Sequence, residues 1–358
     1  MEAKGVVLYI GGFELPDKNA AAQRVVGNAY ALKTLGYDVV FLNKTKCKNN
    51  LNTTYYGCTC INSKKSSWKY LTSANEVKKI IKQYQVTHLI AYNYPATALK
   101  KIIKFCKKNN VKCYADVTEW YEIKGNPLKK LVKKYDVDLR MKVLHKQMDG
   151  VIAISEYLYQ YYVKDVKTVK VPPLVNIAAE KWNKIDKFNE NKTVFSYVGS
   201  PSARKEKLDI VVKTIDALSN KRDVKLIVVG ITKAEFEQMY SCLIESNAIE
   251  FMGRLPHEEA IKVVKQSNWS IIIRENFLFV KAGFPTKVVE SISCGTPVLA
   301  NKFSNIQDYL NVNNSMLFDN DEQLMNTIET ACVNNVQVDN SVFHYSNYLK
   351  KFMELFKD

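Results

Sequence analysis

Lys287 and Glu290 are the two residues whose types and spacing most readily suggest chemistry. They lie three positions apart in the stretch 286–293, which the sequence predicts to be a helix, so an ammonium and a carboxylate project from one face. Pro285 presets the first helical turn, and the N–H groups there favour an anion. The pair therefore fits an anion flanked by hydroxyls, such as the diphosphate and ribose of a sugar nucleotide. An ordinary surface ion pair, worth about 0.3 to 0.5 kcal/mol, explains the same spacing.

The segments on either side of this helix complete a βαβ unit. Residues 269–273 and 297–300 are continuous apolar runs of the buried-strand type. Gly283 allows a tight turn before the helix, and Cys294-Gly295 ends it. The pattern places Lys287 and Glu290 just beyond the carboxyl end of a buried strand.

The run GFPTKVVESISCGTPVLAN, at 283–301, resembles the donor-binding segment of the GT4 group of retaining glycosyltransferases, which have the GT-B fold. The resemblance implies a nucleotide-diphosphate sugar as donor and no metal. Many GT4 members have a glutamate eight positions before Glu290, where this chain has Ala282. The chain is similar instead to a subset with a Pro-Thr-Lys segment and an upstream Arg-Glu pair, here Arg274-Glu275. Glu275 is the candidate to replace the missing carboxylate at the sugar hydroxyls.

A second phosphate-binding signal follows the strand expected at 193–198. The N–H groups of Gly199 and Ser200, with the side chain of Arg204 or Lys205, can meet a diphosphate at the next helix start. GT4 enzymes commonly have an arginine after this glycine and a lysine several residues on, which favours Lys205. The turn around Arg254 resembles the family's turn that often faces the base. The predicted donor-binding residues are Gly199, Ser200, Arg204, Lys205, Arg254, Arg274, Glu275, Phe284, Pro285, Thr286, Lys287 and Glu290.

The first half offers candidates for the acceptor at two strand ends. Gly11 and Gly12 end the strand at 6–10, and a helix capped by Asn19 follows. In GT4 enzymes that glycine loop lies near the transferred sugar. A second group follows the strand at 111–115, where open α/β sheets bind ligands, and Trp120 offers a platform for a sugar ring. The predicted acceptor-binding residues are Gly11, Gly12, Asn19, Arg24, Asp116, Glu119 and Trp120.

No general base can be assigned, because the histidine that many GT4 members have in this region is absent. The candidate catalytic residues are Lys205, Lys287, Glu275 and Asp116. The resemblance implies no metal, so we expect no cofactor and no metal requirement, with cations and helix N-termini stabilising the leaving diphosphate.

The net charge of +16 is concentrated in the first half of the chain. Residues 1–170 hold 30 Lys and Arg against 13 Asp and Glu, a balance of +17, whereas residues 171–358 have a balance of −1. Such asymmetry favours a polyanionic partner: nucleic acid, an anionic membrane surface or phosphate-bearing substrates. Most of these residues are lysines, which favours diffuse attraction over base reading, and a solvated lysine-rich surface explains the charge equally well.

Two segments are candidates for contact with a membrane. Trp68, Tyr70 and Leu71 lie in a polar and basic loop at 44–73, in which we expect a short strand near Tyr55 and Tyr56. The predicted helix at 96–109 has one apolar and one lysine-rich face. Local packing and a solvated helix face are the alternatives.

No apolar stretch is long enough to span a bilayer, and the N-terminus lacks the pattern of an export signal. The eight cysteines are scattered, and Cys58-Thr59-Cys60 lacks a second pair at zinc-ligand spacing, so we expect reduced thiols in the cytoplasm.

Alternating strands and helices, with a Pro-Pro connector and polar segment near 172–190, predict an α/β protein of two Rossmann-like halves facing a cleft. The expected domains are an acceptor-binding 1–172, a nucleotide-sugar-binding 173–340, and a helix at 341–358 that crosses back to the first domain, as in GT-B enzymes. We expect a retaining hexosyltransferase that uses a UDP- or GDP-linked sugar and a glycan acceptor, which the basic first domain suggests is lipid-linked, in bacterial surface polysaccharide synthesis.

Three other functions remain open: a non-catalytic glycan-assembly subunit, a GT-B sugar-nucleotide epimerase and a basic nucleic-acid-binding protein. An epimerase would need acids and histidines in the cleft, and only four histidines occur. Nucleic acid is not expected as a partner, because it would not explain the segment from Pro285 to Glu290.

Overall fold

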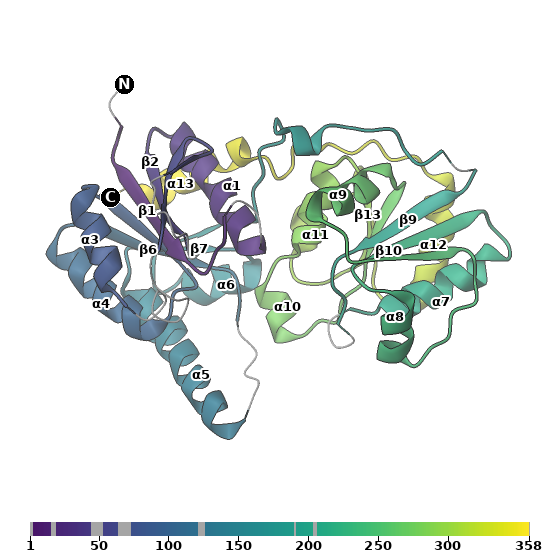
Figure 1. Cartoon of the computed structure of the whole chain (residues 1–358), viewed down its shortest axis with the longest axis horizontal. Coiled ribbons are helices and arrows are strands. Elements are labelled where there is room, and N and C mark those ends of the chain that lie inside the picture. Colours follow the sequence, from purple (N-terminus) through teal and green to yellow (C-terminus); the bar gives the residue numbers. More distant parts are fainter. Residues whose placement is uncertain are drawn as a thin grey trace. The chain divides into compact units, whose positions relative to one another are not determined.

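The computed structural model describes residues 3–15, 19–43, 53–63, 73–120, 126–189, 191–202 and 206–357 (Figure 1). The chain forms two compact units. The first consists of Met1–Asn176, Ala282–Phe284 and Tyr345–Asp358, and the second of Ile177–Lys281 and Pro285–His344. The expected α/β architecture with two Rossmann-like halves is confirmed.

The first unit is built on a sheet with strand order β3-β4-β2-β1-β5-β6-β7-β8. Every described pairing is parallel except that of β3 with β4. The strands are β1 (Val6–Gly11), β2 (Asp38–Asn43), β3 (Thr53–Tyr55), β4 (Cys58–Asn62), β5 (His88–Tyr92), β6 (Lys112–Val117), β7 (Gly150–Ala153) and β8 (Thr168–Lys170). Apart from β3, the central residues of these strands are apolar and buried because helices cover both faces of the sheet.

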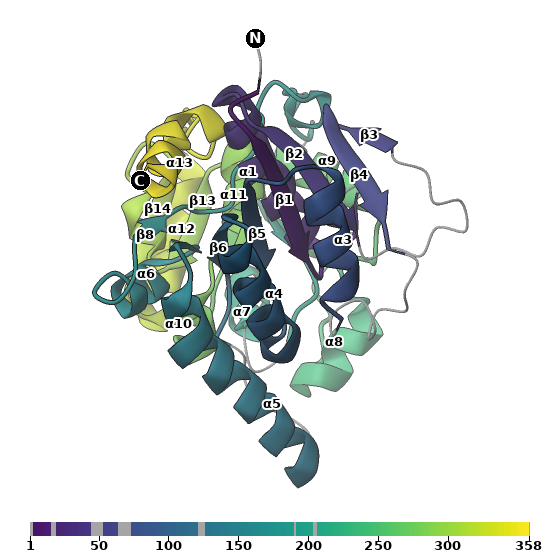
Figure 2. The same ribbon diagram turned by 90° about the vertical axis from the view of Figure 1, so that its left-hand side faces the viewer.

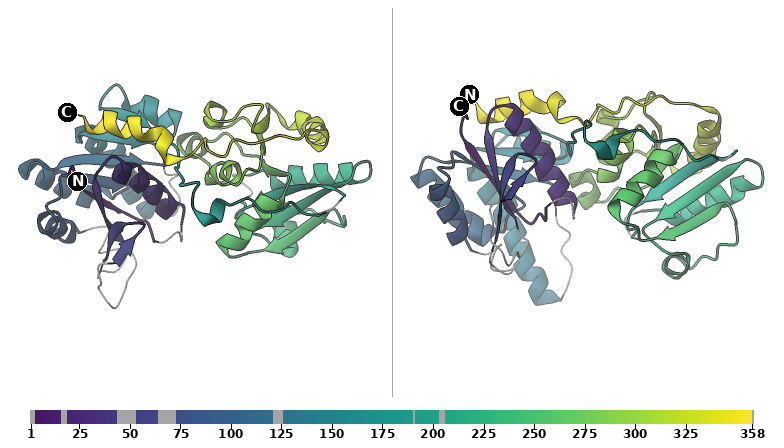
Figure 3. Two further views of the ribbon diagram at one scale, coloured as in Figure 1. Left: turned by 90° about the horizontal axis from the view of Figure 1, so that it is seen from above. Right: turned by 45° about the horizontal axis from the view of Figure 1, so that its top comes forward.

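The helices of the first unit segregate by face. On one face, α1 (Ala20–Thr34) lies beside the C-terminal α13 (Leu349–Phe356), and both pack on the same core (Figure 3). On the other face lie α3 (Asn75–Gln83) and α4 (Ala96–Lys108) (Figure 2). The remaining helices are α5 (Pro127–Leu139), which continues into a π-helical turn at Arg140–Leu144, and α6 (Glu156–Tyr162).

The second unit is a parallel sheet with strand order β11-β10-β9-β12-β13-β14. The strands are β9 (Thr193–Val198), β10 (Val224–Val229), β11 (Ile249–Gly253), β12 (Trp269–Ile272), β13 (Val298–Asn301) and β14 (Ser315–Phe318). The helices are α7 (Leu208–Ser219), α8 (Lys233–Tyr240), α9 (His257–Gln266), α10 (Leu278–Ala282), α11 (Thr286–Ser293) and α12 (Leu324–Val333). Numbered along the chain, this order is 3-2-1-4-5-6, the arrangement of the doubly wound nucleotide-binding fold.

Several elements differ from the sequence prediction. The predicted loop at 44–73 contains β4, paired in parallel with β2, whereas Trp68, Tyr70 and Leu71 lie outside the described residues. The helix expected at 341–356 begins only at Leu349, after a 3₁₀ turn at Tyr345–Tyr348. The sequence pattern predicts a helix at 233–246, but α8 ends at Tyr240, because Ser241 adopts a left-handed backbone conformation with φ of 50°.

Among the residues that the structure describes, no helix combines the length and the apolar character needed to cross a bilayer. The described cysteines are free thiols, and Cys58 and Cys60 are buried in β4.

Helix α1 approaches the connector that leaves the first sheet so closely that only glycine fits at one position. A Cβ atom on Gly27 would lie 2.1 Å from the carbonyl oxygen of Leu174. Alanine is about 1 kcal/mol better than glycine inside a helix, but relieving this overlap requires the backbone to move. We therefore expect Gly27→Ala to destabilise the first unit by about 1–3 kcal/mol, measured by urea unfolding.

Gly12→Ala is the matched control, because a Cβ atom there would meet no other atom within 4 Å. Its unfolding midpoint should match that of the unsubstituted protein. A Gly27→Ala midpoint that is also unchanged would contradict the close approach of α1 to the connector.

Candidate active site

The predicted donor residues gather where the strand order of the second sheet reverses. β9 pairs with β10 on one side and β12 on the other, so a crevice opens beyond the carboxyl ends of β9 and β12. Gly199 follows β9, and Arg274 lies two residues beyond β12. Ligands of open parallel sheets bind at such a switch point.

Lys287 lies at this switch point, in the first turn of α11. Its Nζ donates hydrogen bonds of 3.0 Å to both carboxylate oxygens of Glu206 and one of 2.9 Å to the hydroxyl of Tyr197. Glu206 also accepts a hydrogen bond of 3.0 Å from Nη2 of Arg274 and one from the Tyr197 hydroxyl. Two cations therefore share one carboxylate, and all three charged side chains are largely shielded from solvent.

Burial shapes the chemistry of the Lys287 ammonium. Its removal from solvent lowers the pKa to about 8, although the charge of Glu206 acts in the opposite direction. Gly199, with a φ of 139°, leaves the space that the lysine chain fills, because a Cβ atom there would lie 2.2 Å from Cε of Lys287. The structure thus brings together the predicted residues Gly199, Arg274 and Lys287.

Glu290 projects from the next turn of α11 and pairs with a histidine. Its Oε1 lies 3.1 Å from Nε2 of His257, the first residue of α9. The sequence alone predicts His257 to be an ordinary polar residue of a first helical turn. The contact holds the carboxylate in place at the edge of the switch point, where it is only 17% exposed.

One predicted donor residue, Glu275, pairs with a lysine outside the predicted set. Glu275 lies 2.9 Å from Nζ of Lys207, which also binds Asp321. This pairing occupies one oxygen of the carboxylate that the sequence offers as a replacement for the one missing at Ala282. Phe284 belongs with the first unit, Thr286 begins α11, and Arg204 and Lys205 lie outside the described residues.

A hollow of about 340 Å³ lies beside the switch point in the second unit. The exposed Arg254 lines it and pairs with Glu235 at 3.0 Å. The lining residues come from the ends of β9, β10 and β11 and from α8: Ser200, Pro201, Gly230, Ile231, Glu235, Gln238, Met239 and Arg254.

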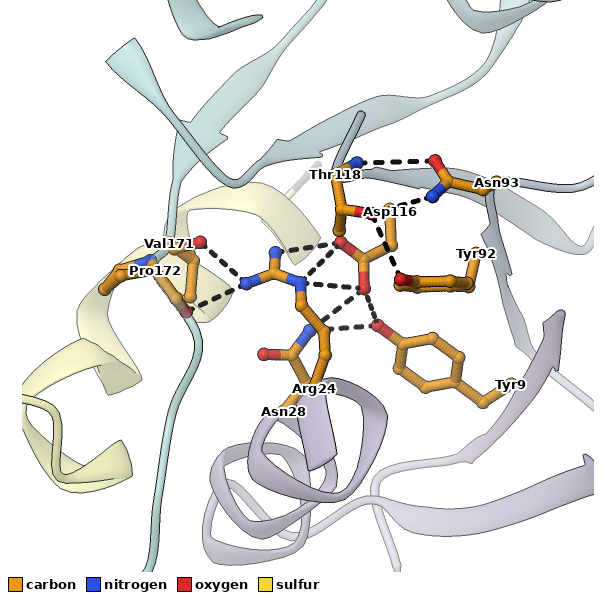
Figure 4. Close-up of polar contacts among 9 residues, drawn as sticks. All are labelled: Tyr9, Arg24, Asn28, Tyr92, Asn93, Asp116, Thr118, Val171 and Pro172. Atoms are coloured by element: carbon orange, nitrogen blue, oxygen red, sulfur yellow. Dashed lines mark hydrogen bonds and ion pairs between the residues drawn. The ribbon is translucent and has the colours of Figure 1, made fainter. Parts of the chain in front are cut away.

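Arg24 and Asp116, two predicted acceptor-binding residues, belong to a buried polar network in the first unit (Figure 4). Asp116 is fully buried and forms an ion pair with Arg24, whose Nε and Nη2 lie 3.0 and 2.8 Å from Oδ1. Oδ2 accepts hydrogen bonds from Tyr9 and Asn28. Nη1 of Arg24 donates to the carbonyl oxygens of Val171 and Pro172, both at 2.8 Å. Arg24 and Asp116 therefore stabilise the interior of the first unit by pairing with each other, and Asp116 is not positioned to act on a ligand.

Polar side chains follow the carboxyl ends of β5 and β6, above this network in the view of Figure 4. Asn93 donates to the hydroxyl of Thr118 at 2.7 Å, and the Thr118 hydroxyl donates to that of Tyr92 at 3.1 Å. Asn93 has a φ of 42°, a left-handed conformation that asparagine tolerates. β5 flanks the point where the strand order of the first sheet reverses, between β1 and β5, and β6 is the next strand.

The other predicted acceptor residues lie at separate places in the first unit. Asn19 caps α1 by accepting a hydrogen bond of 2.9 Å from the amide of Ala22, as predicted. Glu119 is exposed, and the ring of Trp120 lies edge-on to those of Tyr157 and Tyr161. Gly11 ends β1 against Tyr92, whereas Gly12 faces open space.

Sequence reasoning missed the anionic partner of the donor cations. Glu206 lies in the run ARKEK, in which the sequence predicts a diphosphate contact for Arg204 or Lys205 and no role for Glu206. The available signal was that two cations placed near one buried turn require a carboxylate between them. Tyr197 and His257 are joined to the site only by tertiary contacts.

Comparison with known proteins assigns the second unit to a family. Residues 178–340 match the family model described as glycosyl transferases group 1. No curated protein matches the chain in sequence.

Solved structures resemble the whole chain. A glycosyltransferase from Rickettsia africae ESF-5 has a TM-score of 0.70 at 15% identity, covering 100% of this chain and 98% of that one. A sucrose-phosphate synthase from Thermosynechococcus elongatus has a TM-score of 0.68 at 14% identity, with 98% of each chain covered. Anabaena Alr3699/HepE in complex with UDP has a TM-score of 0.67 at 14% identity, with 99% of each chain covered. The family expected from the segment around Lys287 is confirmed: this chain has the GT-B fold, and its residues 178–340 form a glycosyl transferases group 1 domain.

Proposed function

We propose that the protein is a retaining, metal-independent glycosyltransferase that transfers a hexose from a UDP- or GDP-linked sugar to a glycan acceptor. The observation that carries this proposal is the Lys287 ammonium, held beside Gly199 at the switch point of the second sheet. A donor diphosphate at that place would compete with Glu206 for the lysine and for Arg274. The carboxylate of Glu290, which lies 3.1 Å from Nε2 of His257, is the proposed acceptor of hydrogen bonds from two ribose hydroxyls.

The hollow lined by Gly230 and Arg254 is the proposed place of the base, since it adjoins Gly199 and Ser200. A nearby carboxylate, Glu235, is suited to the N–H groups of uracil or guanine. Alr3699/HepE, which resembles this chain, has been solved with UDP, which makes UDP the first nucleotide to test.

The proposed reaction retains the configuration of the donor sugar, and the charges around Lys287 support it. The bond between the anomeric carbon and the diphosphate oxygen breaks, and the acceptor oxygen bonds to the same face of that carbon. The acceptor proton passes to the departing phosphate, so that the products are a glycoside and a nucleoside diphosphate. The cations near Lys287 would stabilise the negative charge that develops on the diphosphate, the electrostatic contribution that is often the largest in catalysis.

The proposed acceptor is a lipid-linked glycan of bacterial surface polysaccharide synthesis, used at the cytoplasmic face of the membrane. The excess of lysines in the first 170 residues supports this choice, since both lipid phosphates and anionic head groups attract them. The polar ends of β5 and β6, with Asn93 and Thr118, are the proposed contacts of the acceptor sugar.

Release of nucleoside diphosphate tests this function. Purified protein would be incubated with UDP- and GDP-hexoses and a lipid-extracted acceptor pool, with and without EDTA, and the anomeric configuration of the product determined by NMR. We expect release from one donor, unaffected by EDTA, and a product with the donor's configuration. Binding of nucleotide without any transfer would instead favour a non-catalytic glycan-assembly subunit, which Ala282 in place of a familiar carboxylate would explain.

A further inference from the structure

We propose that the exposed apolar face of α5 docks the first unit onto an anionic membrane. This inference builds on the proposed lipid-linked acceptor, because it names the element that would bring the protein to the membrane that holds such an acceptor. It is carried by the anchoring, the exposure and the charge pattern of one helix.

Helix α5 is anchored at one end and free of the sheet at the other. Asn126 caps its first turn by accepting a hydrogen bond of 2.9 Å from the amide of Lys129. Near its C-terminal end, Oδ1 of Asp136 accepts a hydrogen bond of 2.8 Å from the amide of Ala96, which begins α4, and Val137 is buried. The N-terminal turns extend away from the body of the first unit (Figures 1 and 2).

Three large apolar side chains lie on the projecting part and are exposed. Leu131, Val132 and Tyr135 are 66%, 61% and 65% exposed. Their spacing of one, three and four positions places them on one face of the helix. An apolar face that projects into water indicates contact with another surface.

Lysines occupy the other side of the same turns. Lys129, Lys130, Lys133 and Lys134 are exposed, and no acidic residue occurs between 127 and 135. The neighbouring α4, which packs against α5, adds exposed lysines at positions 100, 101, 104, 107 and 108. An apolar face bordered by lysines is typical of a helix that lies in the surface of an anionic bilayer.

Other occupants of this face fit less well. A second copy of the chain packed on α5 would bring lysine against lysine, with no acidic residue on these turns to balance them. Nucleic acid would use the lysines but would leave Leu131 and Val132 in water. A bilayer accommodates both features, because acyl chains receive the apolar side chains while lysine stems reach the head groups.

The test is cosedimentation of the full chain with vesicles of phosphatidylcholine alone or mixed with phosphatidylglycerol. We expect binding to the mixed vesicles at least about tenfold tighter than to neutral ones. The variant Leu131→Ser/Val132→Ser/Tyr135→Ser should lose about tenfold or more of this affinity. The matched control is Leu243→Ser/Val312→Ser/Val333→Ser, which changes three still more exposed apolar residues of the second unit and should bind as the unsubstituted protein does.

Calorimetric titration of both variants with UDP separates this inference from the proposed function. Unchanged UDP binding with unchanged vesicle affinity in the α5 variant would overturn the docking proposal alone. Vesicle binding without any nucleotide binding would overturn the proposed function alone. A dimer that dissociates in the α5 variant, without vesicle binding, would identify the face as an interface between copies and overturn the membrane proposal.

Discussion

Lys287→Ala is expected to lower the rate of glycosyl transfer by about 10²- to 10³-fold, the effect of removing one charge-stabilising donor from an active site. Among the described residues, Lys287 is the cation that a Cβ atom on Gly199 would contact, and it lies in the first turn of α11, at the switch point of the second sheet. Arg274 remains beside Glu206 in the variant, so that the carboxylate keeps a cationic partner at 3.0 Å. The measurement is steady-state release of nucleoside diphosphate, with Lys262→Ala, an exposed lysine of α9, as control.

The same lysine predicts a pH dependence. Because burial lowers the pKa of Lys287 to about 8, the free enzyme loses this charge as the pH rises through 8, and kcat/KM should fall there. The effect on stability has the opposite sign. The unfolded chain binds the proton up to its ordinary pKa of about 10.5, so this group destabilises the fold below pH 8 and ceases to do so as the pH rises towards 10.5. A flat kcat/KM profile between pH 7 and 10 would contradict the role of Lys287.

Asp116→Ala is expected to destabilise the first unit by about 3–5 kcal/mol, the cost of leaving a buried cation without its partner. Arg24 is 2% exposed, and its remaining acceptors would be the carbonyl oxygens of Val171 and Pro172. The measurement is urea unfolding monitored by circular dichroism.

Two further variants make the Asp116 result specific. Asp165→Ala removes a carboxylate that is 47% exposed and pairs with Lys146, so it should cost less than about 1 kcal/mol. The double variant Arg24→Met/Asp116→Leu removes both charges and should be more stable than Asp116→Ala. Equal unfolding midpoints for Asp116→Ala and Asp165→Ala would contradict the buried network.

The fold was largely predictable because the strands of both sheets are short apolar runs bounded by turn residues. The unit formed by β12, α11 and β13 follows from the periodicity of residues 269–300 and from Gly295 at the helix end. The prediction of a loop at the position of β4 is wrong for a physical reason. Its strand alternates small polar and apolar residues, and its pairing with β2 is a tertiary contact without a local signature.

The candidate site was predictable only for residues that a local pattern marks. Gly199, Arg274 and Lys287 stand at strand ends or helix starts, where parallel sheets bind ligands. Glu206, Tyr197 and His257 reach the site from separate elements, and spacing along the chain does not encode such contacts. For Asp116 the local pattern was misleading. Its position after the strand predicted at 111–115 suggested a ligand contact, but in the structure Arg24 and Tyr9 bind its carboxylate inside the first unit.

Calorimetric titration with UDP, GDP and ADP, with and without EDTA, tests the central claim most directly. The account predicts micromolar binding of UDP or GDP, unaffected by EDTA, and at least about tenfold weaker in Lys287→Ala, the equivalent of about 1.4 kcal/mol. Loss of binding in EDTA, equal binding by Lys287→Ala, or no binding of any nucleotide would contradict it.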